Sequence, residues 1–245
     1  MLLLLYFGGW VLVIGVSILS SIGIWELHRM LERHSVRFFP MIAVIWVWAL
    51  IWASSHHHWT VPVVTLGAVV VVLVAIFTRS PEAFEGAVTT SWGALYLGLF
   101  FSFVIRIRRL SHGLHIAFAF FLIIWATDTL AFFVGRQWGR KKLLPKISPS
   151  KTWEGTIGGT LGGILMGLLM AHWSGLTLFE GVFLGLVVSV FGQLGDLLES
   201  AIKRYAGVKD SGVLLPGHGG ILDRFDSALF ALPIAYYLLR SLGIS

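Results

Sequence analysis

The stretch TVPVVTLGAVVVVLVAIF, residues 60–77, decides the fold class of this chain. It contains no charged residue, and a helix of about 20 apolar residues crosses a hydrocarbon core about 30 Å thick while satisfying its own backbone hydrogen bonds. Apolar runs of similar length recur along the chain, whereas a membrane barrel would show short segments of alternating polarity. We therefore expect an all-α fold, in the form of a polytopic integral membrane helical bundle.

The composition of the whole chain agrees with this fold class. Of its 245 residues, 57% are hydrophobic and only 12% are charged, and the mean hydropathy is +0.86. A soluble domain has about a quarter of its residues charged. Cysteine is absent, which excludes disulfides and thiolate metal sites. The net charge of +6 is carried by Lys and Arg in loops, which indicates membrane topology and anion contacts rather than nucleic-acid binding.

About eight membrane spans are expected, with about seven and nine as the limits. They cover residues 2–24, 38–53, 60–77, 81–105, 115–135, 155–173, 176–194 and 221–239. A polar joint at Glu26–Arg37 separates the first two spans. We expect a single membrane domain over residues 1–245, in which residues 1–110 are mainly structural and residues 111–245 carry the catalytic helices and the cytoplasmic loops.

The positive-inside rule gives the expected orientation of these spans. Most Lys and Arg residues face the cytoplasm if the polar joint, residues 135–154 and residues 195–224 all lie on that side. Arg106, Arg108 and Arg109 then fall on the other side, at the outer interface, unless one span is re-entrant or the number of spans differs. The chain opens with apolar residues and without a basic leader, so we expect no cleavable signal.

The larger polar segment, residues 195–227, reads GDLLESAIKRYAGVKDSGVLLPGHGGILDRFDS. Asp196 and Lys203 lie seven residues apart, on one helical face. Asp223 and Asp226 are three residues apart, at the expected start of the last helix. Two helix ends that each offer carboxylates can surround a hard cation. Mg²⁺ suits this arrangement because it takes only one or two protein carboxylates and fills its remaining positions with water and phosphate.

Cations and glycines accompany these acids. The cations are Lys203, Arg204, Lys209 and His218, and the glycines lie in PGHGG, residues 216–220. Exposed N–H groups just before a helix, with cations nearby, favour a bound phosphate. Carboxylates, a metal and cations together are typical of phosphoryl chemistry. The alternative is that these charges pair with one another and anchor the helix ends.

The smaller polar segment, residues 135–154, carries six cations against one acid. A plain positive-inside loop would give the same count. However, SPSKT, residues 148–152, precedes a helix and places hydroxyls and a lysine where a phosphate or nucleotide would meet the helix N-terminus. That helix carries glycines every four residues, at positions 155, 159, 163 and 167, and we expect this stripe to serve close helix packing.

Asp128 lies inside the apolar run of residues 115–135. A carboxylate at membrane depth is costly, which favours a functional role. The alternative is a structural hydrogen bond to a neighbouring threonine or helix.

Two segments resemble a known family. SAIKRYAGVKDSGVLLPGHGGILDRFD, residues 200–226, resembles the signature of the phosphatidate cytidylyltransferases, also called CDP-diacylglycerol synthases. Residues 135–159, which end in KISPSKTWEGTIGG, are similar to the second conserved block of that family, and residues 126–129 are similar to its entrance. The resemblance covers residues 125–233, with the departure that Phe132 stands where the family commonly has tyrosine.

The resemblance implies a membrane enzyme that joins CTP and phosphatidic acid into CDP-diacylglycerol and pyrophosphate, with Mg²⁺ and a second, monovalent cation such as K⁺. The implied metal ligands are Asp196, Asp223 and Asp226, with Lys203 as a further catalytic residue. The expected substrate-binding residues are Asp128, Ser148, Lys151, Thr152, Arg204, Lys209, Asp210, His218, Gly219 and Arg224. We also expect a homodimer, a bacterial inner (cytoplasmic) membrane, and an active site towards the cytoplasm.

The chemistry of the substrates agrees with these residues. A phosphate monoester has a second pKa of about 6, so phosphatidic acid is largely ionised at pH 7 and needs no strong general base. His218 is accordingly expected as a hydrogen-bond donor to phosphate rather than as a base. The alternatives are a CTP-dependent lipid kinase, which needs a base near a lipid hydroxyl, and an ion-coupled transporter that uses Asp128 and the acids at the helix ends.

Overall fold

The computed structural model describes residues 1–32, 36–212 and 219–245, and the expected all-α membrane fold is confirmed. The α-helices are α1 (Leu2–Phe7), α2 (Gly9–Glu32), α3 (Pro40–Ala53), α4 (Thr60–Thr78), α5 (Glu82–Ala94), α6 (Phe101–Arg108), α7 (Gly113–Trp138), α8 (Trp153–Ala171), α9 (Leu178–Tyr205) and α10 (Leu222–Ser241). A 3₁₀ turn, η1 (His57–Trp59), precedes α4, and a π-helical turn, η2 (Leu95–Phe100), joins α5 to α6. Two short strands, β1 (Lys142–Leu144) and β2 (Ser148–Thr152), form a hairpin between α7 and α8.

Every expected span contains a helix, but not every helix is long and apolar enough to cross a membrane. Within the described residues, six helical stretches meet both conditions: α2, α4, the continuous stretch Glu82–Arg108, α7, α8 and α9. The apolar helix α3 has only 14 residues, and α10 is not among the six. The protein is therefore an integral membrane protein with several spanning helices.

The first helix departs from the sequence-based expectation. The expected single span over residues 2–24 is interrupted at Gly8 and Gly9, whose φ angles of 62° and 49° are positive. The second helix, α2, then extends to Glu32. The prediction of a polar joint that begins at Glu26 was wrong, because Glu26 lies inside α2 and is only 6% exposed. Its carboxylate accepts hydrogen bonds from backbone N–H groups, so its burial leaves few polar atoms unsatisfied.

The described chain divides into two compact units. Unit 1 comprises residues 1–6, 107–204 and 225–245, and unit 2 comprises residues 7–106 and 205–224. We expected the mainly structural part to end at residue 110, which lies close to the division between residues 106 and 107. Residues 205–224, which we expected in the catalytic part, group with the N-terminal helices.

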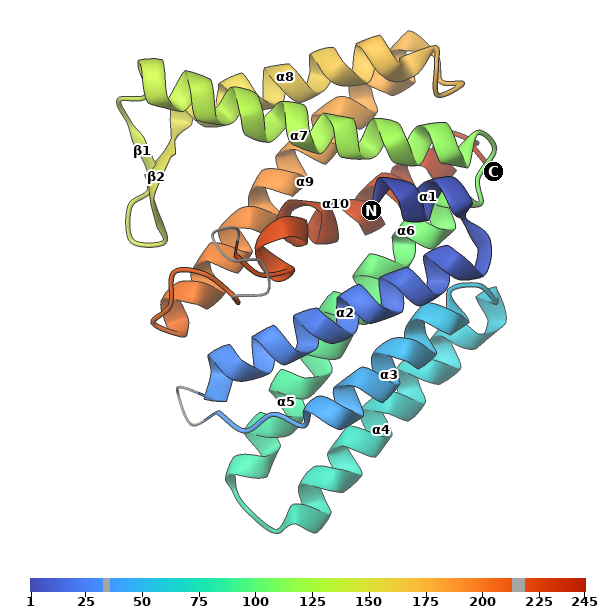
Figure 1. Cartoon of the computed structure of the whole chain (residues 1–245), viewed down its shortest axis with the longest axis vertical. Helices are drawn as coiled ribbons and strands as arrows, with labels where there is room; N and C mark the ends of the chain where they lie inside the picture. The colour runs from blue at the N-terminus through green and yellow to red at the C-terminus, as the bar shows by residue number, and fades with distance from the viewer. Residues whose placement is uncertain (33–35, 213–218) are drawn as a thin grey trace. The chain divides into compact units, whose positions relative to one another are not determined.

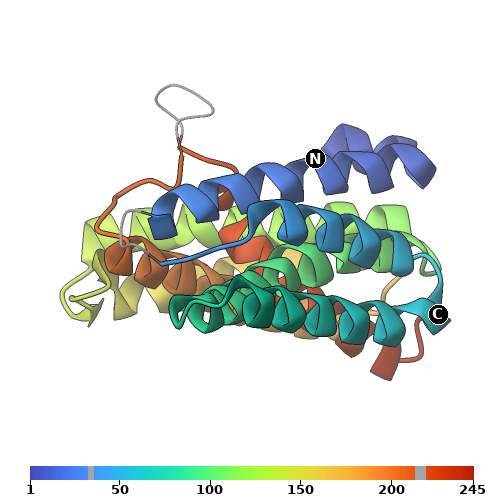
Figure 2. The ribbon, with the colours of Figure 1, turned by 90° about the horizontal axis from the view of Figure 1, so that it is seen from below.

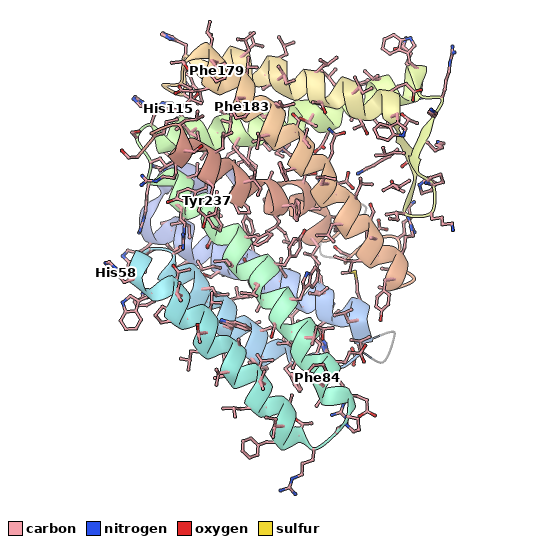
Figure 3. The ribbon with its side chains drawn as sticks, turned by 180° about the vertical axis from the view of Figure 1, so that it is seen from behind. His58, Phe84, His115, Phe179, Phe183 and Tyr237 are labelled. Atoms are coloured by element: carbon pink, nitrogen blue, oxygen red, sulfur yellow. The ribbon has the colours of Figure 1, made fainter. Side chains whose placement is uncertain are left out.

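In unit 1, α7 and α8 run antiparallel and side by side, with the hairpin at one end (Figure 1). His115, Phe179 and Phe183 lie at the end away from the hairpin (Figure 3). The glycine stripe of α8 serves packing, as expected. A Cβ atom at Gly155 or Gly159 would come within 2.8 Å of a backbone carbonyl of α7, so only glycine allows this approach.

In unit 2, α2 and α3 run side by side (Figure 2), and α3 also packs on α4 and α5. The Oγ of Ser20 on α2 donates a hydrogen bond of 3.2 Å to the carbonyl of Leu97 in the π-helical turn. His58 lies at one end of this unit and Phe84 at the other (Figure 3). The buried hydroxyl of Ser20 is thereby satisfied within its apolar surroundings.

Candidate functional site

The hairpin of unit 1 fixes the start of α8. Thr152 is the N-cap of this helix, and its Oγ1 accepts a hydrogen bond of 3.2 Å from the N–H of Gly155. Glu154 reaches back to the N–H groups of Arg140 and Lys141, at 3.1 Å and 3.3 Å. The N–H of Trp153 donates to the carbonyl of Lys141 at 2.9 Å. Lys151, the residue before the cap, is thus held between a strand and a helix N-terminus.

Lys151 forms an ion pair with Asp196 of α9. Its Nζ lies 2.6 Å from Asp196 Oδ2, and the two side chains are 23% and 32% exposed. Both residues were predicted for the site, and the structure brings them together. Gly195 precedes Asp196, and a Cβ atom there would lie 2.5 Å from the carbonyl of Asp226, so the backbones of α9 and α10 are in close contact at this point.

Three carboxylates of unit 1 act on one another electrostatically. Asp226 interacts with Asp196 and with Asp128, and Asp128 also interacts with Asp196 and Lys151. These like charges repel in partly desolvated surroundings, and a cation among them reduces that repulsion. Either a proton or a bound cation among these carboxylates would relieve the repulsion.

A cavity of about 520 Å³ opens beside these residues. Asp128, Lys151, Thr152 and Asp196 line it, and such a volume lies within the range of small-molecule sites, about 300–1,000 Å³. The lining also contains residues that we did not predict, namely Ala131, Phe132, Gly135, Arg136, Lys142, Ser150, Gly155, Thr156 and Gln193.

Several of these unpredicted residues carried a signal in the sequence, of which Arg136 and Gln193 are examples. Arg136 belongs to the smaller polar segment, and Gln193 precedes Asp196 by three residues on the same face of α9. The Nε2 of Gln193 donates to Thr160 Oγ1 of α8 at 3.0 Å, so Gln193 also joins two walls of the cavity.

The other predicted residues of unit 1 lie outside the cavity lining. Lys203 pairs with Glu199 one turn earlier on α9, at 2.5 Å, and the Glu199 side chain is only 2% exposed. The Nε of Arg204 donates to the carbonyl of Ile147 in the hairpin, at 3.2 Å. Ser148 is buried in β2. The pairing of Lys203 with Glu199 agrees with the alternative that some charges anchor one another.

In unit 2, Asp223 organises the segment that precedes α10. Its Oδ2 accepts three hydrogen bonds of 2.8 Å each, from the N–H and the Oγ of Ser211 and from the N–H of Gly220. Gly219 has a φ of +77°, a conformation that side chains disfavour. The Oδ2 atom is therefore already engaged by donors of the protein itself.

Of the expected phosphate nest, residues 216–220, the first three lie outside the described residues, and the N–H groups that follow them bond to carboxylates. The N–H of Gly220 donates to Asp223, and the N–H groups of Ile221 and Leu222 donate to Glu26. Lys209, Asp210 and Arg224 are exposed. The prediction for His218 lies outside the described residues.

The three predicted metal ligands are divided between the units. Asp196 and Asp226 belong to unit 1 and Asp223 belongs to unit 2. Among the described residues, no group of three or more His, Asp and Glu side chains is close enough to hold one ion. The donor chemistry nevertheless fits Mg²⁺, because Asp196 and Asp226 supply carboxylate oxygens in the number that Mg²⁺ takes from proteins.

Comparison with known proteins agrees with this chemistry. A family model described as "Cytidylyltransferase family" matches residues 1–242. The chain is 40% identical over 242 residues to a phosphatidate cytidylyltransferase of Staphylococcus aureus (strain COL), which covers 95% of this chain and 91% of that protein. It is 36% identical over 230 residues to the phosphatidate cytidylyltransferase of Bacillus subtilis (strain 168), covering 90% and 86% of the two chains. The corresponding protein of Staphylococcus haemolyticus (strain JCSC1435) is 36% identical over 245 residues, with 96% and 92% covered.

Proposed function

The chain belongs to the cytidylyltransferase family, and from this premise we propose that it transfers the cytidylyl group of CTP to phosphatidic acid. The observation that supports this proposal best is the pairing of Lys151 with Asp196 at the cavity that Asp128 also lines. It joins the two polar segments of the sequence in one partly desolvated place. Cations are needed where two anionic substrates meet, and carboxylates can hold a metal cation there.

The proposed reaction is an in-line displacement at phosphorus. A phosphate oxygen of phosphatidic acid attacks the α-phosphorus of CTP, and the bond from that phosphorus to the bridging oxygen of the β-phosphate breaks. The products are CDP-diacylglycerol and pyrophosphate. Because the attacking phosphate is already ionised, positioning and charge neutralisation supply the catalysis. Lys151 binds phosphate oxygens in this scheme. The family resemblance implies further positive charge from Lys203, Arg204 and Lys209, of which Lys203 is paired with Glu199 in this structure.

Mg²⁺ is the proposed cofactor, held by Asp196 and Asp226 and, as the family resemblance implies, by Asp223. When bound, it neutralises charge on the triphosphate and stabilises the leaving pyrophosphate. A second, monovalent cation such as K⁺ remains part of the proposal. The mutual repulsion of Asp128, Asp196 and Asp226 supports a cation at this place.

The lipid substrate explains the apolar part of the cavity. Phe132 lines the cavity and is 59% exposed on α7, a spanning helix, so acyl chains have an apolar surface beside the polar groups. We place the enzyme in a bacterial inner membrane with the site towards the cytoplasm, where CTP is made. We also propose a homodimer, which the particle mass in detergent would test.

The decisive experiment uses CTP labelled at the α-phosphate, phosphatidic acid and the purified protein in detergent. Label in the lipid product is expected. If only label from the γ-phosphate reaches the lipid, the protein is a CTP-dependent lipid kinase. If neither label reaches a lipid while the protein remains folded, the proposal is refuted and transport becomes the function to test.

A further inference from the structure

Glu26 of α2 has a role that the proposed reaction does not assign to it. Its side chain is buried within unit 2, where Oε1 accepts the N–H of Ile221 and Oε2 accepts the N–H of Leu222, each at 2.9 Å. The Oγ of Ser211 lies 3.2 Å from Oε2. The carboxylate therefore bonds to backbone about 195 residues away in sequence, at the start of α10.

The start of a helix is where such a carboxylate is most effective. The first N–H groups of a helix have no partner within it, and the partial positive charge of the N-terminus attracts an anion. Most helices meet this need with a side chain close in sequence. At the start of α10, the N–H groups of Ile221 and Leu222 bond instead to the side chain of Glu26 on α2.

The glycines of the signature segment, residues 200–226, fit around this carboxylate. A Cβ atom at Gly212 would lie 2.7 Å from Glu26 Oε1, and one at Gly220 would lie 2.3 Å from Ser211 Oγ and 2.5 Å from Glu26 Oε2. Neither glycine has a positive φ, so the space that Glu26 and its partner Ser211 occupy explains both glycines better than backbone conformation does. The segment is thus shaped to receive Glu26.

Ser211 links Glu26 to Asp223. Its Oγ lies 2.8 Å from Asp223 Oδ2 and 3.2 Å from Glu26 Oε2, and a hydroxyl has one proton to donate to the pair. The Asp223 carboxylate also holds the N–H groups of Ser211 and Gly220. A displacement of Glu26 would therefore reach Asp223 through a shared hydroxyl and through the adjacent backbone.

We propose that Glu26 is a positioning residue for cytidylyl transfer, which fixes the start of α10 and thereby the orientation of Asp223. This inference rests on the proposed function, in which Asp223 serves the metal site. It gives the N-terminal helices a part in the reaction beyond the structural role expected from the sequence.

The test compares Glu26→Gln with Glu180→Gln in the full-length protein. Glutamine keeps the length of Glu26 but places an NH₂ group where one carboxylate oxygen accepts an N–H. Glu180 is a matched control, because it caps the start of α9 by accepting the N–H of Thr177 at 2.7 Å. Hydrogen exchange of residues 219–224, followed by mass spectrometry, should be about tenfold faster in Glu26→Gln and unchanged in Glu180→Gln.

Kinetics separate positioning from a merely structural role. In Glu26→Gln we expect kcat to fall about 10- to 100-fold and the half-saturating Mg²⁺ concentration to rise. A structural role would lower only the fraction of active enzyme, and the Mg²⁺ dependence would stay the same. Glu26→Asp keeps the charge on a shorter side chain and should lie between the wild type and Glu26→Gln in both measurements.

The outcomes are distinct. If exchange at residues 219–224 and the Mg²⁺ dependence are both unchanged in Glu26→Gln, the inference is overturned. If Glu26→Gln does not fold, Glu26→Asp carries the same two measurements, and wild-type values in both overturn it equally. If the wild type transfers no α-label to lipid, the proposed function fails, and the exchange experiment still decides whether Glu26 holds the start of α10.

Discussion

Replacing Lys151 by alanine removes the cation that lies 2.6 Å from Asp196 Oδ2 and leaves Asp196 facing Asp128 and Asp226 without it. The effect on folding should be moderate. The two side chains are 23% and 32% exposed but the Lys151 Nζ itself is buried, so solvent screens the pair only in part. An exposed ion pair contributes about 0–1 kcal/mol and the loss of one partner of a buried pair costs about 3–5 kcal/mol, and we expect a value between these limits.

The effect on catalysis is a separate quantity. A hydrogen bond to a charged group contributes about 1.5–3 kcal/mol. If Lys151 makes one such bond to a substrate phosphate in the transition state, its loss lowers kcat/KM about 10- to 150-fold. Stability and rate are therefore measured on the same variant, so that a loss of catalysis is distinguished from a loss of folded protein.

The assay measures transfer of α-label from CTP to lipid, together with thermal unfolding in the same detergent. Lys146→Ala is the matched control, because Lys146 is an exposed lysine of the same hairpin that lies outside the cavity lining. We expect a normal rate for Lys146→Ala and partial recovery for Lys151→Arg, which keeps the charge. Unchanged kinetics for both substrates in Lys151→Ala would refute the role of this residue in binding phosphate.

Three further predictions concern the acids, the helix contact and the histidine. Asp223→Asn and Asp226→Asn should each abolish Mg²⁺-dependent transfer while the circular dichroism spectrum stays helical, and full activity in either purified variant contradicts its place in the metal site. Gly195→Ala should destabilise the protein by about 1–3 kcal/mol, because the added Cβ would lie 2.5 Å from the carbonyl of Asp226; an unaltered melting temperature would show that the two backbones can separate freely. His218→Ala should lose less activity than Asp223→Asn, and the reverse order would revive the general-base role for His218.

The chemistry of the site was easier to predict than its contacts. Lys151 and Asp196 were both expected from their residue types and from the segments around them, yet they lie 45 residues apart on different elements. Their pairing depends on how α8 and α9 pack, which the local sequence does not encode. The glycine stripe of α8 did predict such packing, because four glycines on one face have a direct steric meaning.

Glu26 shows where such reasoning fails. A glutamate near an arginine-rich stretch indicates a polar joint, since a carboxylate is seldom buried without partners. Its partners are backbone N–H groups at residues 221 and 222, which local sequence patterns do not connect to it. The hairpin was missed for a similar reason. Proline and lysine in residues 148–152 disfavour a strand. The strand nevertheless forms, with Lys142 paired to Thr152 across the hairpin.

The contacts of the hairpin also determine which positions around it can be substituted. A two-stranded hairpin has little stability of its own, so the position of Lys151 depends on the contacts at the hairpin's ends. At one end Glu154 bonds to the N–H groups of Arg140 and Lys141, and at the other Arg204 bonds to the carbonyl of Ile147. On the hairpin side all of these partners are backbone groups. Substitutions at positions 140, 141 and 147 therefore preserve the contacts, whereas Glu154 and Arg204 supply the side chains and tolerate change poorly.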